Sequence, residues 1–521
     1  MHYENILTTP PHPSTLFTTA IFLLQTFNVL QGHVDFRHIH DQVTRTHSVA
    51  TVAATLQLLF TCLTTYYHDS LLLWSASHFS FPTTTQYSTL DTLLLHTATF
   101  LCAHALAYLY KILVLVYKVC RYRQLTSSGM TGENRVDGTT PRRILLVHAS
   151  VGSGHKRAAQ AIREALEERY ASEPVVIETV DVVNTMQWFL KAVYKDGFMT
   201  LVTKDWGAAF IGLMFDKSNG AAPGITVGSN GFLQTLTEEM FMLSFAETVL
   251  NFKPDVIVNT HFLPTKVLSH MRTTISSFEI PHLTVVTDYD VHAFWAVNPC
   301  ERFFVARDEC RHALESFGVP ARRITITGMP VVRAFSHQLP SRAACLQELS
   351  LDGTLPVILL MAGGEGVLDT FRQLLSMQTP CQIALVCGRY KAKQAALEKV
   401  VVPKHHKVKI EGFTTQMHYY LQSADIIITK PGGLTTAESL ATGTAMAIYH
   451  SLPGQEMRNA DMILEEGAGF KITDSRMLAY KVERVINNAE MLQRMKKNAL
   501  RMGSTTAADE VADFVFRGAF L

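Results

Sequence analysis

The chain has 521 residues and a formal net charge of +1 at pH 7. Its length predicts about three domains, and its near-neutral charge excludes the strongly basic surface of a dedicated nucleic-acid-binding protein. The 8 cysteines are scattered without a Cys-x-x-Cys pair, which argues against a zinc site and a dense disulfide framework and indicates a reducing compartment.

Residues 1–127 are rich in Thr, Leu and His and poor in Lys and Glu. Three apolar stretches in this region approach the roughly 20 residues that a membrane-spanning helix needs: 15–32, 48–66 and 92–117. Lys118, Arg121 and Arg123 follow the third and best candidate, so the positive-inside rule predicts that the rest of the chain is cytoplasmic. We expect a hydrophobic helical region that spans the membrane. The alternative is that it is an upstream extension of the reading frame, with the true start at Met130.

Residues 128–140 are polar and contain glycine, which predicts a linker. Short apolar strands then alternate with helices, a pattern typical of parallel sheets with helices on both faces. The strands expected in a first lobe, residues 141–335, are 143–148, 175–180, 255–259, 282–287, 302–305 and 323–327. Those expected in a second lobe, residues 336–521, are 356–361, 382–387, 407–410, 425–429 and 446–450. Two doubly wound lobes predict a ligand-binding cleft at the carboxyl ends of their strands.

Two turns in the first lobe carry candidate catalytic or ligand-binding residues. The stretch "HASVGSGHKRAAQAIREAL" places Gly152, Gly154 and His155 between the first strand and an amphipathic helix. The stretch "TVVTDYDVHAFW" places Asp288 and His292 at the end of a later strand. Another strand ends in "IVNTHFLP", whose polar residues 259–261 we interpret as structural.

The second lobe contains a candidate phosphate site in "ADIIITKPGGLTTAESLATG". A buried strand is followed by Gly432 and Gly433, and the next helix carries Thr435 in its first turn. The glycines allow a ligand to approach the backbone closely at the helix N-terminus. Such a site favours bound phosphate. Glu438 lies within reach of a ribose diol. An ordinary capped helix is the alternative.

A second glycine loop in this lobe, "LLMAGGEGVLDTF", carries Gly363 and Gly364 after another strand. Two such loops favour a nucleotide ligand over simple structural turns. The loops lack the G-x-G-x-x-G dinucleotide pattern and a Walker A lysine, which argues against ATP hydrolysis.

A third turn, in "YHSLPGQEMRNADMILEEGAG", presents Gln455 and Glu456 at the carboxyl end of a strand. An amide beside a carboxylate offers directed donors and acceptors for sugar hydroxyls. A solvated turn at the start of a helix is the alternative.

Six motifs occur in the order of one known family: "SVGSGH", "VVTDYDVHAFW", "RFFVARDECRHALESFGVPARRITITGMPV", "MAGGEGVL", "GFTTQMHYYLQSADIIITKPGGLTTAESLATG" and "PGQEMRNA". From about residue 143 to about residue 500, the chain resembles the diacylglycerol glycosyltransferases. These comprise the bacterial processive diacylglycerol glucosyltransferases and the plant monogalactosyldiacylglycerol synthases, relatives of the lipid-linked N-acetylglucosaminyltransferase of peptidoglycan synthesis.

This resemblance implies an α/β fold of the GT-B type, with two Rossmann-like lobes and an interlobe cleft. It implies an inverting transfer of a hexose from UDP-glucose or UDP-galactose to diacylglycerol or a glycosylated diacylglycerol at the cell membrane. It implies no cofactor and no metal ion. The alternatives are transfer to a polyprenyl-linked precursor, or a nucleotide-sugar-binding protein without catalysis.

The resemblance also assigns donor contacts. Gly432, Gly433 and Thr435 correspond to diphosphate contacts, with Gly363 and Gly364 in the other donor loop, and Glu438 corresponds to the ribose ligand. Phe413 is similar to the residue beside the uracil, and Gln455 and Glu456 match the pair that reads the sugar.

His155 and Asp288 are the candidate catalytic residues. A histidine at a helix N-terminus, which lowers its pKa, can remove a proton from the acceptor hydroxyl or hydrogen-bond the departing diphosphate. Asp288 is the alternative base. Gly152 and Gly154 let the loop approach the acceptor, and His292 lies on the acceptor side. The irregular stretch 186–242 contains aromatic and lysine residues, which fit either membrane docking or core packing.

Overall fold

The computed structural model describes residues 141–150, 152, 154–185, 244–274, 278–336, 339–361, 366–452 and 454–518. The expected membrane-spanning stretches, the linker and the aromatic segment lie outside these residues. Within the described ranges, no helix is long and apolar enough to cross a membrane. Both sheets lie in the compact unit that spans residues 118–521.

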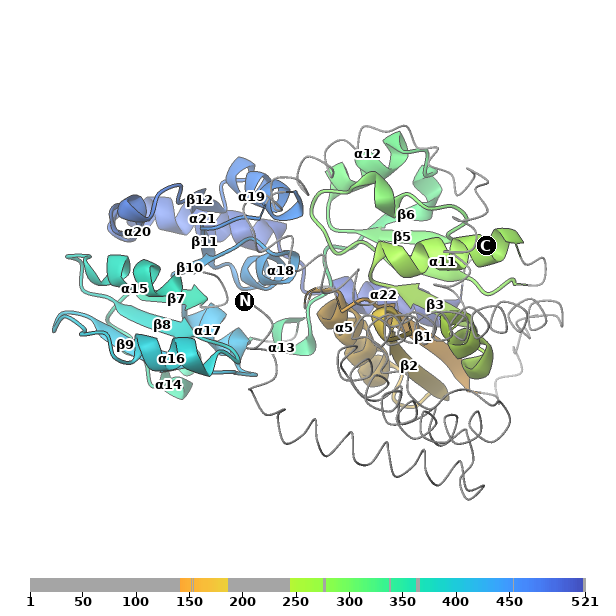
Figure 1. The fold of residues 1–521 in the computed structure, drawn as a ribbon, viewed down its shortest axis with the longest axis horizontal. Helices are drawn as coiled ribbons and strands as arrows, with labels where there is room; N and C mark the ends of the chain where they lie inside the picture. The colour runs from red at the N-terminus through yellow and green to blue at the C-terminus, as the bar shows by residue number, and fades with distance from the viewer. Residues whose placement is uncertain are drawn as a thin grey trace, which may run out of the picture. The chain divides into compact units, whose positions relative to one another are not determined.

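The first lobe contains a six-stranded parallel sheet in the order β2-β1-β3-β4-β5-β6 (Figure 1). Its strands are β1 (Arg142–His148), β2 (Val175–Asp181), β3 (Val256–Asn259), β4 (His282–Val285), β5 (Arg302–Val305) and β6 (Ile324–Ile326). Its helices include α5 (Gly154–Arg169), α6 (Val182–Thr185), α11 (Phe262–Thr274), α12 (Asp308–Ser316) and α13 (Arg333–Ser336), with 3-10 turns η2 (Ala293–Trp295) and η3 (Ala321–Arg323). All six strands expected in this lobe are confirmed.

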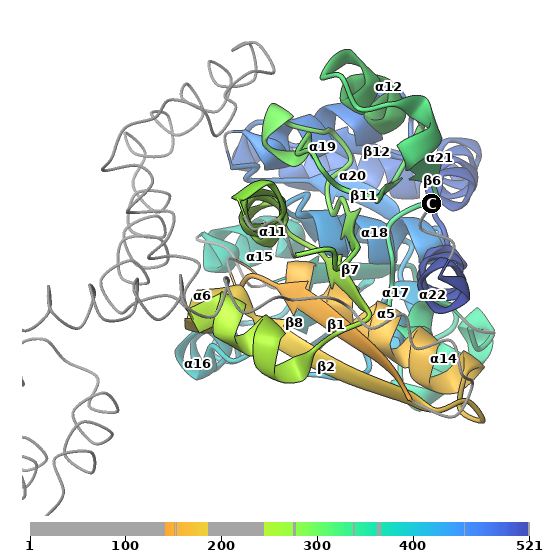
Figure 2. The ribbon, with the colours of Figure 1, turned by 90° about the vertical axis from the view of Figure 1, so that its right-hand side faces the viewer.

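Helices cover both faces of this sheet, as its continuous apolar strands require. Leu146 of β1 packs in the cluster that contains Ile162 of α5, whereas its neighbour Leu145 packs in the cluster that contains Leu268 of α11. Successive side chains of a strand point to opposite faces, so α5 and α11 lie on opposite sides of β1 (Figure 2).

The second lobe contains another six-stranded parallel sheet, in the order β12-β11-β10-β7-β8-β9. Its strands are β7 (Val357–Met361), β8 (Gln382–Val386), β9 (Lys407–Glu411), β10 (Ile426–Thr429), β11 (Ala445–Ile448) and β12 (Gly469–Lys471). Its helices are α14 (Arg342–Glu348), α15 (Val367–Leu375), α16 (Lys391–Leu397), α17 (Met417–Ser423), α18 (Gly433–Thr442), α19 (Gln455–Glu465), α20 (Leu478–Ile486) and α21 (Ala489–Met502), with the turn η4 (Ser475–Met477). The expected list of strands missed β12, because three residues beginning with glycine give no alternation signal.

The direction of winding reverses once in each sheet. In the first sheet β1 lies between β2 and β3, and in the second β7 lies between β8 and β10. Ligands of doubly wound sheets bind at such switch points, beyond the carboxyl ends of the strands. The glycine-bearing turns after β1 and β10 both follow strands at these switch points, so the topology points to the same turns as the sequence motifs.

The last helix of the chain, α22 (Ala507–Arg517), packs against α5 of the first lobe. The Arg169 Nε and the Tyr170 hydroxyl donate to Asp513 at 2.7 and 2.8 Å. Tyr170 also stacks on Phe516, with 3.7 Å between ring centroids. The C-terminus therefore closes a helix layer of the N-terminal sheet.

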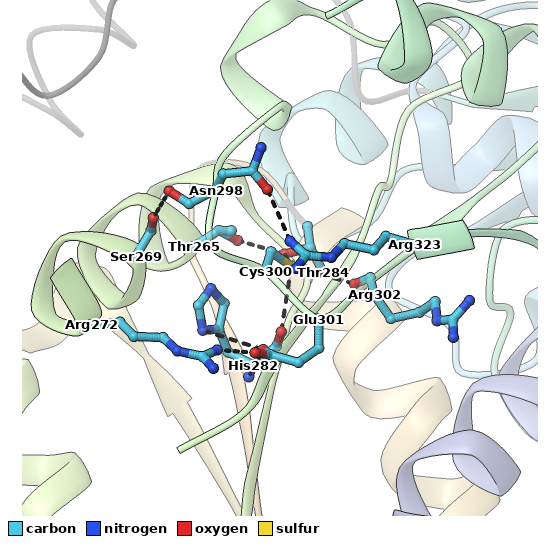
Figure 3. A network of polar contacts seen from close by, with 10 residues as sticks. All are labelled: Thr265, Ser269, Arg272, His282, Thr284, Asn298, Cys300, Glu301, Arg302 and Arg323. Carbon is cyan, nitrogen blue, oxygen red and sulfur yellow. Dashed lines mark hydrogen bonds and ion pairs between the residues drawn. The ribbon is translucent and has the colours of Figure 1, made fainter. Parts of the chain in front are cut away.

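A polar network ties α11 to the starts of β4 and β5 (Figure 3). The Arg272 guanidinium donates a hydrogen bond to the Glu301 Oε1. The Glu301 Oε2 accepts a hydrogen bond from the His282 backbone N–H at 2.8 Å. Hydroxyls of Thr265 and Thr284 lie 2.9 Å apart. Burial lowers the pKa of His282 to about 3, so this ring is neutral at physiological pH. The network anchors the helix that directly follows the turn at Thr260, which belongs to the candidate active site.

Candidate active site

The N-termini of α5 and α18 approach each other, one from each lobe. A Cβ built on Gly154, the first residue of α5, would lie 3.8 Å from the Leu434 Cβ in the first turn of α18. A Cβ on Gly433 would lie 2.7 Å from the Thr287 carbonyl oxygen, which is too close for a real side chain. Each helix N-terminus carries partial positive charge, so this junction has the electrostatic character of an anion site.

His155 occupies the first turn of α5, and its ring is held by the turns after β3 and β4. Its Nδ1 lies 2.9 Å from the Thr260 carbonyl oxygen and 2.7 Å from the Thr287 Oγ1. Because a carbonyl oxygen only accepts, Nδ1 carries the proton in this arrangement and Nε2 presents a lone pair. The His261 ring packs edge-on against His155, with 4.5 Å between centroids.

The His155 ring is neutral at physiological pH. Burial lowers its pKa to about 4, and the hydrogen bond to Thr260 acts in the opposite direction. The sequence predicted a lowered pKa from the helix N-terminus, whereas burial is the largest cause in the structure. A neutral ring with a lone pair on Nε2 accepts a hydrogen bond from a hydroxyl.

Asp288 lies one residue after Thr287, and the Trp295 indole N–H donates to its Oδ2 at 3.1 Å. Burial raises the pKa of Asp288 to about 7, Trp295 opposes this change, and the nearby Asp290 adds to it. A carboxyl group that titrates near neutrality has the protonation behaviour of a general base.

Glu438 makes an ion pair across the lobe interface. The Arg157 Nη2, on α5, lies 3.1 Å from its Oε1, and the Glu438 side chain is 6% exposed. Burial raises the pKa of Glu438, while Arg157 lowers it through charge and a hydrogen bond. The predicted ribose ligand therefore lies at the boundary of both lobes.

Gln455 and Arg458, at the start of α19, contact the turn that contains Asp288. The Gln455 amide donates to the Asp290 carbonyl oxygen at 2.8 Å, and the Arg458 Nη1 lies 2.5 Å from the Asp290 Oδ2. The buried Asn459 accepts from the Tyr289 N–H at 3.3 Å and donates to a carbonyl oxygen of its own lobe. These contacts hold the two predicted halves of the site together.

The other predicted donor residues lie at the carboxyl ends of the second sheet. Lys430 lies 2.7 Å from the Glu456 Oε1, and Glu456 also accepts the Leu452 N–H at 3.0 Å. Phe413, 59% exposed, lies under the Arg389 guanidinium at 5.0 Å from its ring centroid. Thr435 is partly exposed in the first turn of α18.

The remaining predicted residues have mixed outcomes. Gly152 is exposed and has a φ of 90°, a backbone conformation that favours glycine. His292 is 2% exposed, and its Nδ1 accepts the Phe294 N–H as the cap of η2, so the visible role of its ring is structural. Gly363 and Gly364 lie outside the described residues.

Sequence reasoning missed several residues that build this site. Arg157 and Thr287 lie inside motifs that drew attention for their neighbours, and Thr260 was interpreted as structural. Thr260 and Thr287 act on His155 through a carbonyl and a hydroxyl, which carry no special sequence signal. Across the described ranges, no group of three or more His, Cys, Asp and Glu side chains is arranged to hold a metal ion.

Two different protein families match the two lobes of the chain. Residues 155–331 match the monogalactosyldiacylglycerol (MGDG) synthase family, and residues 337–513 match the glycosyltransferase family 28 C-terminal domain. The processive diacylglycerol beta-glucosyltransferase of Bacillus subtilis is 24% identical over 392 residues, covering 73% of this chain and 96% of that protein. The Staphylococcus epidermidis protein of the same name is 29% identical over 367 residues, covering 70% and 89%.

A plant protein is similarly related. Monogalactosyldiacylglycerol synthase 1, chloroplastic, of Arabidopsis thaliana is 26% identical over 410 residues, covering 75% of this chain and 74% of that protein. The two matched families occur in one chain in the order of the lobes, and the relatives extend across both. Across both lobes, the chain is therefore similar to the diacylglycerol glycosyltransferases.

Proposed function

We propose that the protein is an inverting glycosyltransferase that moves a hexose from a UDP-sugar to the hydroxyl of diacylglycerol or a glycosylated diacylglycerol. The observation that carries this proposal is the meeting of the α5 and α18 N-termini between His155 and Glu438. The names of the relatives, which specify diacylglycerol as the glycosylated substrate, support this acceptor class.

The donor binds to the second lobe in this proposal. The diphosphate lies at the N-terminus of α18, where Gly432 leaves room for close approach, Gly433 lets the Thr287 turn pack closely, and Thr435 adds a hydroxyl. Glu438 accepts the ribose hydroxyls, and Phe413 packs on the uracil. Gln455 and Glu456 bind sugar hydroxyls, exchanging their present contacts with Asp290 and Lys430 for the substrate.

The acceptor hydroxyl is activated by the first lobe. The His155 Nε2 accepts a hydrogen bond from this hydroxyl and orients it. The hydroxyl has a single hydrogen, so in this proposal its O–H bond turns from His155 to the Asp288 carboxylate as the reaction begins. The oxygen attacks C1 of the sugar, the bond from C1 to the diphosphate oxygen breaks, and the hydroxyl proton passes to the Asp288 carboxylate. Asp288 suits proton removal better than His155 because its pKa of about 7 is nearer to neutral pH than the value of about 4 for His155.

The leaving UDP gains negative charge, which the two helix N-termini stabilise. We propose that the transfer needs no resident metal ion or cofactor, since these dipoles act on the diphosphate directly. Activity that is unchanged by a chelator is the expected result. We also propose that the protein acts at the cytoplasmic face of a cell membrane. A diacylglycerol acceptor resides in a bilayer, and the basic residues Lys118, Arg121 and Arg123 favour the cytoplasmic side.

The test is transfer of radiolabel to dioleoylglycerol in detergent micelles, with UDP-glucose and UDP-galactose supplied separately to the full chain. Lipid-soluble label from either donor supports the proposal and identifies the sugar. UDP binding without label from either donor contradicts the acceptor assignment. The same assay with a polyprenyl diphosphate acceptor then tests the alternative substrate class.

A further inference from the structure

Arg157 connects the two lobes at the predicted ribose ligand. It lies two residues after His155 on α5, and its guanidinium reaches the Glu438 Oε1 on α18 at 3.1 Å. The pair is unequal in exposure, with 6% of the Glu438 side chain and 35% of the Arg157 side chain exposed. The first lobe thus contributes a cation to a carboxylate of the donor lobe.

A carboxylate this deeply buried depends on a nearby positive charge to stay ionised. Burial favours the neutral acid, and an opposite charge at hydrogen-bond distance favours the anion. Both effects act on Glu438, where burial raises the pKa and Arg157 lowers it. Breaking a buried ion pair by removing one partner leaves the other uncompensated. Glu438 would then take up a proton more readily.

Among the described residues, the charged side chain that acts on Glu438 is Arg157. The elements packed on α18 are α5, α13, α17, α19, α21 and β11. β11 carries no ionisable side chain. Several ionisable side chains on the helices pair elsewhere: His155 with Thr260, Arg333 with Glu168 and Asp509, Glu456 with Lys430, Arg458 with Asp290, Lys496 with Asp425, and Arg501 with Glu466. The same helices also carry Lys156, Asp461, Glu465, Glu490, Arg494 and Lys497, none of which is among the charges that act on Glu438. His418 of α17 has a pKa lowered by burial, which favours its neutral form.

The two oxygens of the Glu438 carboxylate are not equivalent. Oε1 accepts from Arg157, and no hydrogen bond to Oε2 occurs within the described ranges. An ionised carboxylate has about four lone-pair directions. One oxygen can therefore be held by the guanidinium while the other accepts hydroxyl groups.

We propose that Arg157 is a positioning residue of the donor site, which keeps the Glu438 carboxylate ionised and leaves Oε2 to accept the ribose hydroxyls. This inference rests on the proposed binding of a UDP-sugar by the second lobe. It makes the donor site a product of both lobes, because the ribose ligand depends on a residue two positions after the acceptor-binding histidine.

The opposite role makes a different prediction. If Arg157 merely occupied Glu438 in competition with the ribose, its removal would tighten UDP binding. If it supports the carboxylate, removal weakens UDP binding most at low pH, where Glu438 is protonated, and binding recovers as the pH rises.

The experiment is calorimetric titration of UDP into the full chain between pH 6 and pH 8.5. The variants are Arg157→Met, Arg157→Lys and Glu438→Gln, with Arg163→Met as the matched control on α5. Arg163 pairs with Glu167 on the exposed face of the helix. All affinities are taken relative to the wild type at each pH, which removes the titration of UDP itself, and thermal unfolding confirms that each variant is folded.

For Arg157→Met we expect UDP affinity at least about tenfold weaker at pH 6 and a smaller loss at pH 8.5, since one pKa unit corresponds to a tenfold change. Arg157→Lys should recover part of the loss because it keeps the charge. Glu438→Gln should lose affinity equally at every pH, and Arg163→Met should match the wild type.

The failures are distinguishable. Wild-type protein that binds no UDP overturns the proposed function. Wild-type binding that Glu438→Gln weakens, combined with unchanged or tighter binding by Arg157→Met, overturns the role of Arg157 and leaves the proposed function intact. A loss in Arg157→Met that does not depend on pH also overturns it, because a general structural effect would not follow the protonation of Glu438.

Discussion

The His155 Nδ1 lies 2.9 Å from the Thr260 carbonyl oxygen, so the proton of the ring is fixed on the nitrogen that faces the first lobe. His155→Ala removes the Nε2 lone pair that orients the acceptor hydroxyl. We expect kcat to fall at least about 100-fold, with UDP affinity nearly unchanged, since the His155 side chain is not among the proposed donor contacts. Steady-state kinetics and UDP titration measure the two effects. His312→Ala, which replaces an exposed histidine, is the matched control. Near-normal turnover in His155→Ala would remove His155 from the mechanism.

The pH dependence of kcat/KM discriminates between the two candidate bases. A base acts in its unprotonated form, so activity should rise with pH through the pKa of the base. Asp288 predicts a midpoint near 7, and His155 predicts one near 4. We expect the midpoint near 7, and the Asp288→Asn variant should lose turnover at every pH. A flat profile from pH 5 to pH 8 would contradict the assignment to Asp288.

Asp288 should also lower stability at high pH. Its pKa in the folded protein is raised from 3.8 to about 7, so folding disfavours the ionised form. Its contribution to stability is fully present below pH 3.8 and is lost as the pH rises through 7. Asp288→Asn should therefore increase the free energy of unfolding at pH 8, by no more than about 4 kcal/mol, and give no gain near pH 4. Denaturant unfolding at both pH values measures this difference, and an equal change at both would count against ionisation as the cause.

Gly433 and its neighbour Gly432 offer a matched pair of substitutions. A Cβ at Gly433 would lie 2.7 Å from the Thr287 carbonyl oxygen, whereas one at Gly432 would lie 3.8 Å from the Glu456 Oε1. Gly433→Ala should push the two turns apart and lower kcat by about tenfold or more, because small misplacements of reacting groups are costly. Gly432→Ala should retain more activity. Equal activity in the two variants would show that the close approach at Gly433 does not matter for turnover.

The pair Asp290–Arg458 joins the lobes beside Asp288, but its side chains are 36% and 31% exposed. Solvent screening limits such a pair to about 1 kcal/mol or less. Asp290→Asn and Arg458→Met should each lower kcat/KM up to about fivefold, and the double variant should be little worse than either single variant, since both remove the same contact. Full additivity in this double-mutant cycle would mean that the two side chains act independently.

The positions of most strands follow from the sequence because a buried parallel strand is a short apolar run bounded by turn residues. All six strands of the first sheet and five of the second were expected near their observed bounds. β12 escaped because its three residues, Gly469–Lys471, are strand-like only where β11 pairs with them. The placement of α22 on α5 also gives no local signal, since an amphipathic helix at the C-terminus does not specify which sheet it covers.

By itself, the sequence determined the two α/β lobes, the order of the motifs and the turns after β1 and β10, because glycines, strand ends and helix starts are local features. It also identified His155, Asp288, Glu438 and Gln455 as candidate catalytic or donor-binding residues. Only the tertiary structure decided what these side chains contact. The Thr260 carbonyl selects the tautomer of His155, burial sets the different pKa values of His155 and Asp288, and Arg157 reaches Glu438 from the other lobe. These effects depend on burial and on partners that lie 105 and 281 positions apart in the chain, which no local pattern encodes.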